Sequence, residues 1–380
     1  MRVLFISTLA FDANISLIKA LNKKCDIYFI TEALHEVYNH INKDALSKLI
    51  TIGTDVPQIQ RFSELIPLEK TYVVKGCRQI NIFKKIWNSY KIHKLVKKIN
   101  PDVVISDNFL LTYMFTQIYY RKQTLLIVHD PFLHSGEKRF IDSKLRQLYF
   151  SLIPNKILLN LSQRKDFIEF YKQDEGKIYT SFLSVYEYLT CFDSEVRKDN
   201  DFNVLFFGRI SPYKGINYLL EAFMDILNKE TYNNITLTIA GSGNFDFDIS
   251  KYEKFKQIRI INKFIQPDEL AKLISLSSVV VCPYIDATQS GVVMSAFAFK
   301  KPVIATSVGG LPEMISNMKT GILIPPRNKK EIENAIIKLY NTPALLEQME
   351  DSILEEYFEG ERSWVRASDY FFEAIINMSR

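Results

Sequence analysis

Short β-rich apolar runs alternate with segments of helical periodicity along the whole chain, and no other feature constrains the fold as strongly. Runs such as VVVC at 279–282 are apolar throughout, which is typical of strands buried on both faces of a parallel sheet. The alternation predicts strands at 2–6, 26–30, 102–105, 124–128, 156–159, 204–207, 235–240, 258–261, 279–282 and 303–305. Helices are expected between them, for example at 14–22 and 110–120. The predicted class is α/β, with two doubly wound Rossmann-like halves in series.

A charged segment interrupts the alternation near the middle of the chain. Residues 191–202, CFDSEVRKDNDF, show no apolar period, as is typical of a linker. A chain of 380 residues is long enough for two domains of roughly 150 residues or more. The sequence therefore predicts an N-terminal domain over 1–190 and a C-terminal domain over 200–362.

Composition excludes several classes of protein. Hydrophobic residues make up 47% and charged residues 24% of the chain, as in a globular protein and unlike a disordered one. No apolar stretch approaches the roughly 20 residues of a transmembrane helix, and the N-terminal apolar run is too short for a signal peptide. The four cysteines form no CxxC pair, so neither a zinc site nor a disulfide framework is expected. We expect a cytoplasmic protein with reduced thiols.

The segment VLFFGRISPYKGINYLL at 204–220 reads as a strand, a glycine-bounded loop and a helix. Gly208 and Gly215 bound the loop, which carries Arg209 and Lys214. In doubly wound sheets ligands bind at the carboxyl ends of strands. Two cations beside helix N-termini at such an end favour a diphosphate. The alternative is a solvated loop with two ordinary surface cations.

Three further loops lie where ligands would bind. AGSG at 240–243 is weak evidence alone, and no acidic residue follows at the spacing of a ribose-binding carboxylate, so we do not infer a NAD site. Gln289, Ser290 and Gly291 come where a helix should begin, and free backbone N–H groups there suit a phosphate. SVGG at 307–310 adds another glycine pair after a strand. Four such loops in one half of a chain, in this order, are unexpected by chance.

The ordered set GRISPYKG, AGSG, FIQPDEL, a small-residue helix start, PVIAT and GGLPE resembles the family 4 retaining glycosyltransferases of the GT-B fold, over residues 203–340. The resemblance implies two Rossmann-like domains that face a central cleft. The C-terminal domain would hold the nucleotide-sugar donor, and the N-terminal domain would be the acceptor side. It also implies that the last helix, 363–380, packs back on the N-terminal domain. We interpret the apolar stripe of this helix as core; it comprises Trp364, Val365, Tyr370, Phe371 and Ile375.

By the same resemblance Arg209 and Lys214 are catalytic residues that grip the donor diphosphate. It implies that Phe264 and Ile265 lie beside the nucleobase and that Ser290, Gly291 and Val292 bind the diphosphate. We add Gly208, Gln289 and Ser295 to the predicted donor-binding residues from their places in the loops.

The chain departs from that family at two acidic positions. The family pattern has two glutamates separated by seven residues, the second of which binds the donor ribose. Counted back from Pro302, these positions hold Ala287 and Ser295. Gln289 and Asp286 lie close in sequence and are candidates to replace them. The departure leaves open a non-catalytic subunit that binds nucleotide sugars.

A histidine marks the candidate site of the N-terminal half. In TLLIVHDPFLHSGE at 124–137, His129 ends a predicted strand, Asp130 follows it, and His134 lies in the same loop. The resemblance implies that His129 is a catalytic residue that contacts the donor sugar. A single histidine is more often structural, which is the alternative for both.

No metal is expected in this reaction. Asp246 and Asp248 imitate a DxD motif but follow the AGSG turn, so we interpret them as a solvated loop. We find no other cluster of histidine, cysteine and carboxylates with metal-ligand spacing. Two cations and a helix end would already neutralise the diphosphate. No cofactor is predicted beyond the donor substrate itself.

Basic residues are concentrated between Lys70 and Pro101, which hold nine of them and no acidic one. Within this stretch, 82–99 follows a helical period with an apolar stripe and lysines on or beside the polar face. The stripe is Ile82, Phe83, Ile86, Trp87, Tyr90, Leu95, Val96 and Ile99. Such a helix can lie peripherally on an anionic membrane. The alternative is a helix packed on the domain core, and nucleic acid is not expected because no base-reading motif accompanies the lysines.

The sequence and the resemblance together predict a retaining glycosyltransferase of the hexosyltransferase type. It would move a sugar from a nucleotide-diphosphate sugar to a hydroxyl of a glycan or lipid-linked acceptor, in bacterial surface polysaccharide or glycolipid synthesis. We expect it in the cytoplasm, peripherally on the inner face of the membrane. A nucleotide-sugar epimerase of the same fold and a non-catalytic binding subunit are the alternatives. Neither the donor sugar and base, nor the acceptor, nor the oligomeric state follows from the sequence.

Overall fold

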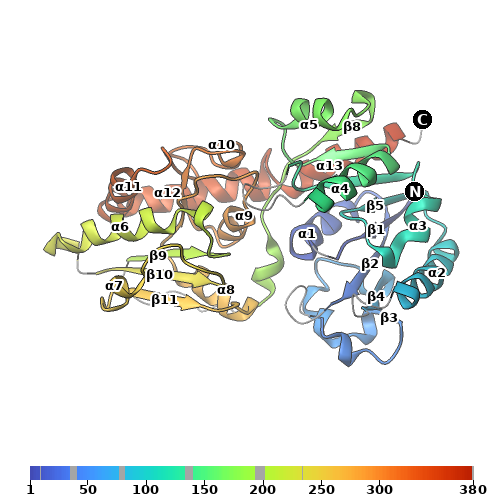
Figure 1. Ribbon diagram of the computed structural model, residues 1–380, viewed down its shortest axis with the longest axis horizontal. Helices are drawn as coiled ribbons and strands as arrows, with labels where there is room; N and C mark the ends of the chain where they lie inside the picture. Colours follow the sequence, from blue (N-terminus) through green and yellow to red (C-terminus); the bar gives the residue numbers. More distant parts are fainter. Residues whose placement is uncertain are drawn as a thin grey trace. The chain divides into compact units, whose positions relative to one another are not determined.

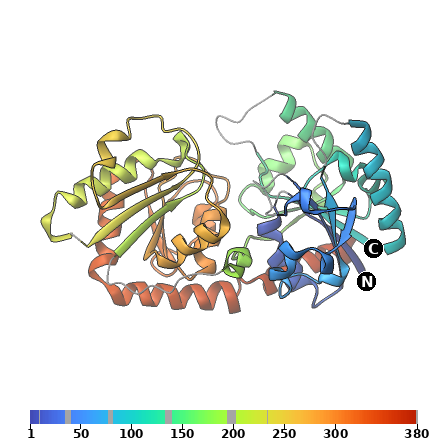
Figure 2. The ribbon, with the colours of Figure 1, turned by 90° about the horizontal axis from the view of Figure 1, so that it is seen from below.

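A computed structural model describes residues 1–8, 10–34, 41–76, 82–132, 140–192, 202–232 and 234–378. The chain divides into two compact units, shown from two sides in Figures 1 and 2. The first unit comprises the described residues of 1–133, 137–183 and 364–380, and the second comprises those of 184–363. Each unit is described by itself below.

The first unit is built on an eight-stranded sheet of order β3-β4-β2-β1-β5-β6-β7-β8. Its pairs are all parallel except β3 with β4. The strands are β1 Arg2–Ile6, β2 Asp26–Ala33, β3 Ile50–Ile52, β4 Thr71–Lys75, β5 Val103–Ser106, β6 Thr124–Val128, β7 Asn155–Leu158 and β8 Ile178–Thr180. The strand order reverses between β1 and β5, and ligands bind beside such a switch point.

Helices flank this sheet. They are α1 Phe11–Leu21, α2 Ile82–Ile99, α3 Met114–Tyr119, α4 Phe140–Leu152, α5 Arg164–Tyr171 and α13 Trp364–Met378, with 3-10 turns at Lys43–Ala45, Gly53–Asp55, Pro57–Phe62, Leu68–Lys70, Leu111–Tyr113 and Glu175–Lys177. The last helix, α13, packs against α1, so both ends of the chain contribute to this unit. An ion pair of 2.7 Å between Lys24 and Asp369 supports that contact. Every residue of β1 after Arg2 and every residue of β6 is buried, as expected for strands covered on both faces.

The second unit holds a six-stranded, wholly parallel sheet of order β11-β10-β9-β12-β13-β14. Its strands are β9 Phe202–Phe207, β10 Ile235–Gly241, β11 Ile258–Asn262, β12 Val279–Cys282, β13 Val303–Thr306 and β14 Gly321–Ile324. Its helices are α6 Ile216–Leu227, α7 Ser250–Glu253, α8 Pro267–Leu276, α9 Gly291–Ala298, α10 Leu311–Met314, α11 Lys329–Asn341 and α12 Pro343–Ile353, with 3-10 turns at Glu187–Cys191, Pro212–Lys214 and Glu230–Tyr232 and a π-helical turn at Leu354–Glu359. The order reverses between β9 and β12, which is the second switch point.

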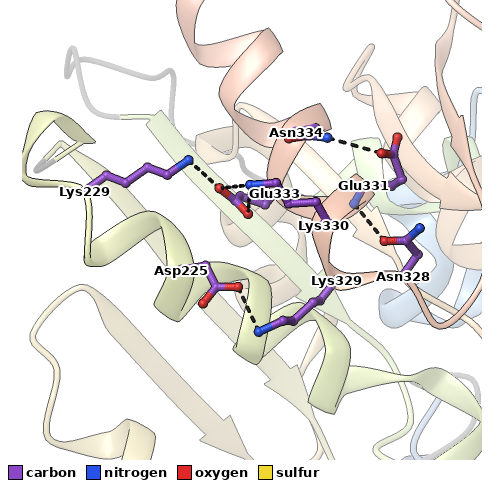
Figure 3. Close-up of polar contacts among 8 residues, drawn as sticks. All are labelled: Asp225, Lys229, Asn328, Lys329, Lys330, Glu331, Glu333 and Asn334. Carbon is purple, nitrogen blue, oxygen red and sulfur yellow. Dashed lines mark hydrogen bonds and ion pairs between the residues drawn. The ribbon is translucent and has the colours of Figure 1, made fainter.

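Ion pairs join α11 to α6 in this unit (Figure 3). Glu333 of α11 is almost completely buried. It accepts hydrogen bonds from Lys229, which follows α6, and from Lys330 of α11 itself. Burial alone would raise the pKa of Glu333, but the two ammonium groups outweigh it, so the pKa is lowered. A second pair of 2.9 Å joins Lys329 to Asp225. The charge of Glu333 is therefore neutralised inside the packed interface.

The predicted class and fold are confirmed, because both units are doubly wound sheets and all ten expected strands coincide with observed ones. Four strands were not predicted, namely β3, β4, β8 and β14. The expected helix at 110–120 is instead a 3-10 turn followed by the short α3. The predicted linker lies mostly outside the described residues.

The apolar stripe of the last helix is only partly core. Phe371 and Ile375 are buried, but Val365 is 54% and Tyr370 is 38% exposed. The expectation that the whole stripe is buried is therefore wrong for these two residues.

Candidate functional site

The loops that follow β9 and β10 are held together by backbone contacts. The amide of Gly208 donates to the carbonyl of Ala240 at 3.0 Å, and that of Ile210 donates to Ser242 at 3.0 Å. A Cβ atom on Gly241 would lie 1.7 Å from the carbonyl oxygen of Gly208, so only glycine permits this approach. The AGSG turn thus supports the loop that carries Arg209.

The same β9 loop also packs against the loop that follows β12, across the switch point. Gly215 has a φ of +63°, and a Cβ atom there would lie 2.0 Å from the carbonyl oxygen of Pro283. The amide of Ile285 donates to the carbonyl of Tyr213 at 2.8 Å. These contacts place the end of the β9 loop, with Lys214, directly beside the loop that leads to α9.

Lys214 and the start of α9 are linked through one aromatic residue. The ammonium nitrogen of Lys214 lies 3.6 Å from the ring centroid of Tyr284, a short cation–π distance. Tyr284 is completely buried, and its hydroxyl lies 3.4 Å from the hydroxyl of Ser290, the N-cap of α9. Arg209 is exposed on the same loop. The structure thus brings the predicted cations and the predicted helix start to one edge of the sheet.

The N-terminus of α9 presents polar groups that suit an anion. The Ser290 side chain makes no capping hydrogen bond to the helix, so it does not occupy the first backbone N–H groups of α9, which begin at Gly291. Nε2 of Gln289 is buried and has no hydrogen-bond partner among the described residues. Val292 is half-buried in the first turn. Donors of this kind at a helix N-terminus favour phosphate oxygens.

Neither of the two residues at the family's glutamate positions can supply a carboxylate. Ala287 is 4% exposed, and Ser295 is 7% exposed on the second turn of α9. The loop after β13 closes on this segment, because the amide of Gly310 donates to the carbonyl of Thr288 at 3.2 Å. Asp286 is half-buried and already has polar interactions. Gln289 is therefore the better placed of the two candidate replacements.

Phe264 and Ile265 lie farther along the sheet. They follow β11, which is two strands from β9, and they precede α8. Phe264 is 40% exposed and Ile265 is half-buried, so an apolar surface is available there. Hydrogen bonds between the side chain of Asn262 and the backbone of Gly243 connect this loop to the AGSG turn. These residues are thus part of the same row of loops, but at its outer end.

His129 lies in the first unit, at the carboxyl end of β6. Burial lowers the pKa of His129 despite the nearby Asp130, so the imidazole is neutral near pH 7. Its Nε2 is buried without a hydrogen-bond partner among the described residues. The residue lines a cavity of about 740 Å³, together with Asp107, Asn108 and Tyr149, which the sequence-based prediction missed. His134 lies outside the described residues.

The described residues hold no group of three or more histidine, cysteine, aspartate or glutamate side chains arranged for a metal ion. In the DxD-like segment Asp246 and Asp248 are exposed, and Asp248 accepts hydrogen bonds from the amide and the hydroxyl of Ser250. The interpretation of this segment as a solvated loop is confirmed.

The apolar stripe of α2 is buried in the second half of the helix and largely exposed in the first half. Val96 and Ile99 are buried, as a core-packed helix requires. Four residues of its first half are exposed, by 41–87%: Ile82, Phe83, Trp87 and Tyr90. Lys91 lies over the ring of Trp87 and Lys94 over that of Tyr90, at 5.5 and 4.7 Å. We call these four exposed residues and two lysines the α2 surface. The alternative of a helix packed on the domain core is confirmed for the second half of α2, since Ile92, Val96 and Ile99 belong to a core cluster. No described helix is long and apolar enough to cross a membrane.

Comparison with known proteins connects this site to sugar transfer. Residues 201–342 match the family described as "Glycosyl transferases group 1". The D-inositol 3-phosphate glycosyltransferase of Pseudarthrobacter chlorophenolicus is 28% identical over 221 residues, 55% of this chain and 50% of that protein. Alignments with two other curated relatives cover 43% and 39% of their lengths. The chain thus spans half or less of these three relatives.

Solved structures resemble the chain over its whole length. Anabaena HepE, solved in complex with UDP-glucose, has a TM-score of 0.66 at 13% identity, with 99% of both chains covered. The UDP-GlcNAc 2-epimerase from Neisseria meningitidis has a TM-score of 0.58 at 13% identity, over 99% of this chain and 100% of that one. At such identities the likeness concerns the fold alone. The GT-B fold is confirmed, and the family match supports a transferase enzyme.

Proposed function

We propose that the protein is a retaining glycosyltransferase that moves a sugar from a nucleotide-diphosphate sugar to an acceptor hydroxyl. The observation that carries the proposal is the contact chain from Lys214 through Tyr284 to Ser290, which gathers a cation and a helix N-terminus at the switch point of the second sheet. The family match over the same residues supports it. The donor sugars bound by solved neighbours such as HepE support a nucleotide-sugar donor.

The proposed chemistry depends on stabilising the leaving group. Arg209, Lys214 and the amides at Gly291 and Val292 would bind the diphosphate and offset the charge that develops as the glycosidic bond breaks, and preorganised contacts of this kind are usually the largest catalytic term. The acceptor hydroxyl would bond to the anomeric carbon on the face from which the diphosphate leaves, so no side-chain nucleophile is needed. The departing phosphate would accept the proton of that hydroxyl, so no side-chain base is needed either. The unpartnered Gln289 amide would bind the donor ribose in place of the missing carboxylates. His129 would contact the donor sugar.

Calorimetry with nucleoside diphosphates and their sugars tests this assignment. We expect one nucleoside diphosphate to bind, and the matching sugar nucleotide to be consumed when an acceptor is added. Binding of none of them contradicts the proposal. Binding without turnover identifies a non-catalytic subunit, and conversion of the sugar nucleotide without acceptor, followed by NMR of the sugar, identifies an epimerase.

The α2 surface supports a membrane location on the inner face, in the synthesis of a surface polysaccharide or a glycolipid. Exposed aromatic side chains flanked by lysines can enter the headgroup layer, and each cation near an anionic surface contributes about 1 kcal/mol. We expect the protein to float with vesicles containing phosphatidylglycerol at low salt, and less at raised salt. Phe83→Ser with Trp87→Ser should abolish flotation. Leu161→Ser, which changes a leucine that is 65% exposed elsewhere in the same unit, should not. Equal flotation of both variants contradicts the membrane role.

A further inference from the structure

One tyrosine lies over the N-terminus of α9, the predicted binding place of the donor diphosphate. Tyr186 precedes the 3-10 turn Glu187–Cys191 and belongs to the second unit, as α9 does. A Cβ atom on Gly291, the first residue of α9, would lie 3.0 Å from Cε2 of Tyr186 and 3.6 Å from its hydroxyl oxygen. The ring edge and the hydroxyl therefore occupy the space that a side chain at residue 291 would need.

The direction of that space places the hydroxyl on the ligand side of the helix end. In an α-helix every Cα–Cβ bond tilts toward the N-terminus, so atoms that meet the Cβ position of the first residue lie beside that terminus. The N–H groups of the first turn have no partner within the helix and point the same way. The hydroxyl of Tyr186 thus borders the place where the amides of Gly291 and Val292 would hold a phosphate.

The backbone of Tyr186 is fixed to α9 itself. Its amide donates to the carbonyl of Met294 at 3.2 Å, and the turn that follows it packs against α9. Two residues earlier, the Ser184 hydroxyl donates to the carbonyl of Tyr357 at 3.4 Å. Tyr186 is 8% exposed, so the surrounding residues hold its ring in place. The tyrosine is therefore positioned at the helix end before a ligand binds.

This contact also explains why residue 291 is a glycine. Gly291 is not among the residues with a positive φ, so its backbone would accept an alanine, which favours helices more than glycine does. The three atoms nearest to its Cβ position all belong to Tyr186. The glycine therefore provides room for the tyrosine, and the two residues form one unit at the start of α9.

We propose that the Tyr186 hydroxyl donates a hydrogen bond to the donor diphosphate, beside the amides of Gly291 and Val292. A phenol hydroxyl can donate, and hydrogen bonds to ionised oxygens are stronger than those between neutral groups. The contact would add to the donors that stabilise the charge of the leaving group. This inference rests on the proposed transferase function, because it assigns a further residue to the same diphosphate site.

The test uses Tyr186→Phe in the full chain, which keeps the ring and removes the hydroxyl alone. Calorimetry with ADP, GDP, UDP and dTDP identifies the nucleoside diphosphate that wild type binds. We expect the variant to bind it roughly tenfold or more weakly, because a hydrogen bond to a charged group is lost. Ligand-observed NMR should give wild type and variant the same affinity for the matching nucleoside, which carries no phosphate. An unchanged diphosphate affinity, or equal losses for nucleoside and diphosphate, overturns the inference.

Tyr252→Phe is the matched control. Tyr252 is also a buried tyrosine of the second unit, with an exposure of 3%, but it belongs to α7. This variant should bind the diphosphate as wild type does, and urea unfolding checks that both variants are folded. Equal effects of Tyr186→Phe and Tyr252→Phe overturn the assignment, because a general loosening of the unit would then explain them.

A double-mutant cycle tests the contact between Tyr186 and Gly291. Gly291→Ala alone should weaken diphosphate binding severalfold, since the new Cβ atom displaces the ring and its hydroxyl. In the Tyr186→Ala background the space is open, so Gly291→Ala should have almost no further effect. Losses that simply add would show that the two residues act separately, which overturns the inference.

Diphosphate binding by wild type separates this inference from the proposed function. Binding that is the same in wild type and Tyr186→Phe overturns the role of the hydroxyl and leaves the transferase proposal standing. If wild type binds none of the nucleoside diphosphates, the transferase proposal and the inference are both overturned, because the second unit then has no diphosphate site.

Discussion

The ammonium group of Lys214 lies 3.6 Å from the ring centroid of Tyr284, and this contact joins two loops that are about 70 residues apart in sequence. Tyr284 is fully buried and in turn meets the N-cap of α9 through Ser290. The lysine is therefore held in place before any ligand arrives. Preorganisation of this kind lowers the cost of binding an anion.

Lys214→Ala should weaken nucleoside diphosphate binding by about 1.5–3 kcal/mol, because a charge-assisted contact is lost. Arg209→Ala should have an effect of similar size. Calorimetry with wild type and variants measures both. Lys251→Ala is the matched control, since Lys251 also lies over a tyrosine ring, at 4.8 Å from Tyr252, but outside the site. Unchanged diphosphate affinity in both the Arg209→Ala and the Lys214→Ala variant contradicts the assignment of these residues to diphosphate binding.

Gly215→Ala should destabilise the protein and weaken diphosphate binding together. The new Cβ atom would lie 2.0 Å from the carbonyl oxygen of Pro283, at a φ of +63° that alanine disfavours. Strain at one such residue costs on the order of 1–3 kcal/mol. Urea unfolding gives the stability, and Gly176→Ala, whose Cβ would meet its nearest neighbour at an ordinary 3.6 Å, serves as the control. A stable variant with full affinity would show that the two loops need not touch.

The elements that the sequence predicted best are those with a strong local signal. The apolar strands and the helix start at Gly291 were placed to within a few residues. An uninterrupted apolar run marks the strands, and small residues mark the start of the helix, so both signals are present in the sequence itself. The strands β3 and β8 were missed since each is only three residues long. Their pairing depends on a neighbouring strand and leaves little periodicity to detect.

The candidate site of the first unit was only half predicted for a similar reason. His129 was found from its place at the end of a strand, yet Asp107 comes only two residues after the predicted strand 102–105. A search for polar residues after every predicted strand would have found it. Tyr149 could not be found in that way, because its helix meets the sheet only in the folded chain. The exposure of Phe83 and Trp87 likewise depends on which neighbours cover α2.

His129→Ala should lower turnover much more than nucleotide affinity. The residue belongs to the first unit, whereas the predicted phosphate-binding loops belong to the second, so we expect the diphosphate contacts to persist without its side chain. Steady-state kinetics gives kcat and KM, and calorimetry gives the affinity for the diphosphate. His93→Ala, which changes a histidine of α2, is the control and should alter neither. Equal losses of turnover and affinity would count against a role at the donor sugar.

Transfer should persist in an excess of chelator. In the proposed mechanism Arg209, Lys214 and the amides of α9 supply the positive potential for the leaving diphosphate, so an added divalent cation is not required. Product formation is measured without EDTA, with excess EDTA, and with EDTA followed by an excess of magnesium or manganese. Activity that vanishes with EDTA and returns with either metal would show that the leaving group depends on a cation from solution.

One buried residue, Lys156, should make a contribution to the free energy of unfolding that increases between about pH 8 and the ordinary pKa of lysine. Lys156 of β7 is fully buried, and its ammonium group donates to the carbonyls of Ile153 and Pro154. Burial, with a smaller effect of Lys177, lowers its pKa to about 8. Above that pH the unfolded chain still binds the proton that the folded chain has released, so the free energy of unfolding increases with pH, by at most about 1.4 kcal/mol per pH unit.

Lys156→Met removes this titration and keeps most of the side-chain volume. Other groups titrate in the same range, among them Cys25 and Cys282, whose pKa values burial raises to about 11. Wild type and the Lys156→Met variant share these groups, so the difference between their free energies of unfolding isolates the contribution of Lys156. We expect that difference to change with pH from 8 to 10, measured by urea unfolding at several pH values. Lys165→Met, which changes a lysine whose side chain is 85% exposed, should show almost no such change. A pH-independent difference for Lys156→Met would mean that Lys156 keeps its ordinary pKa in the folded protein.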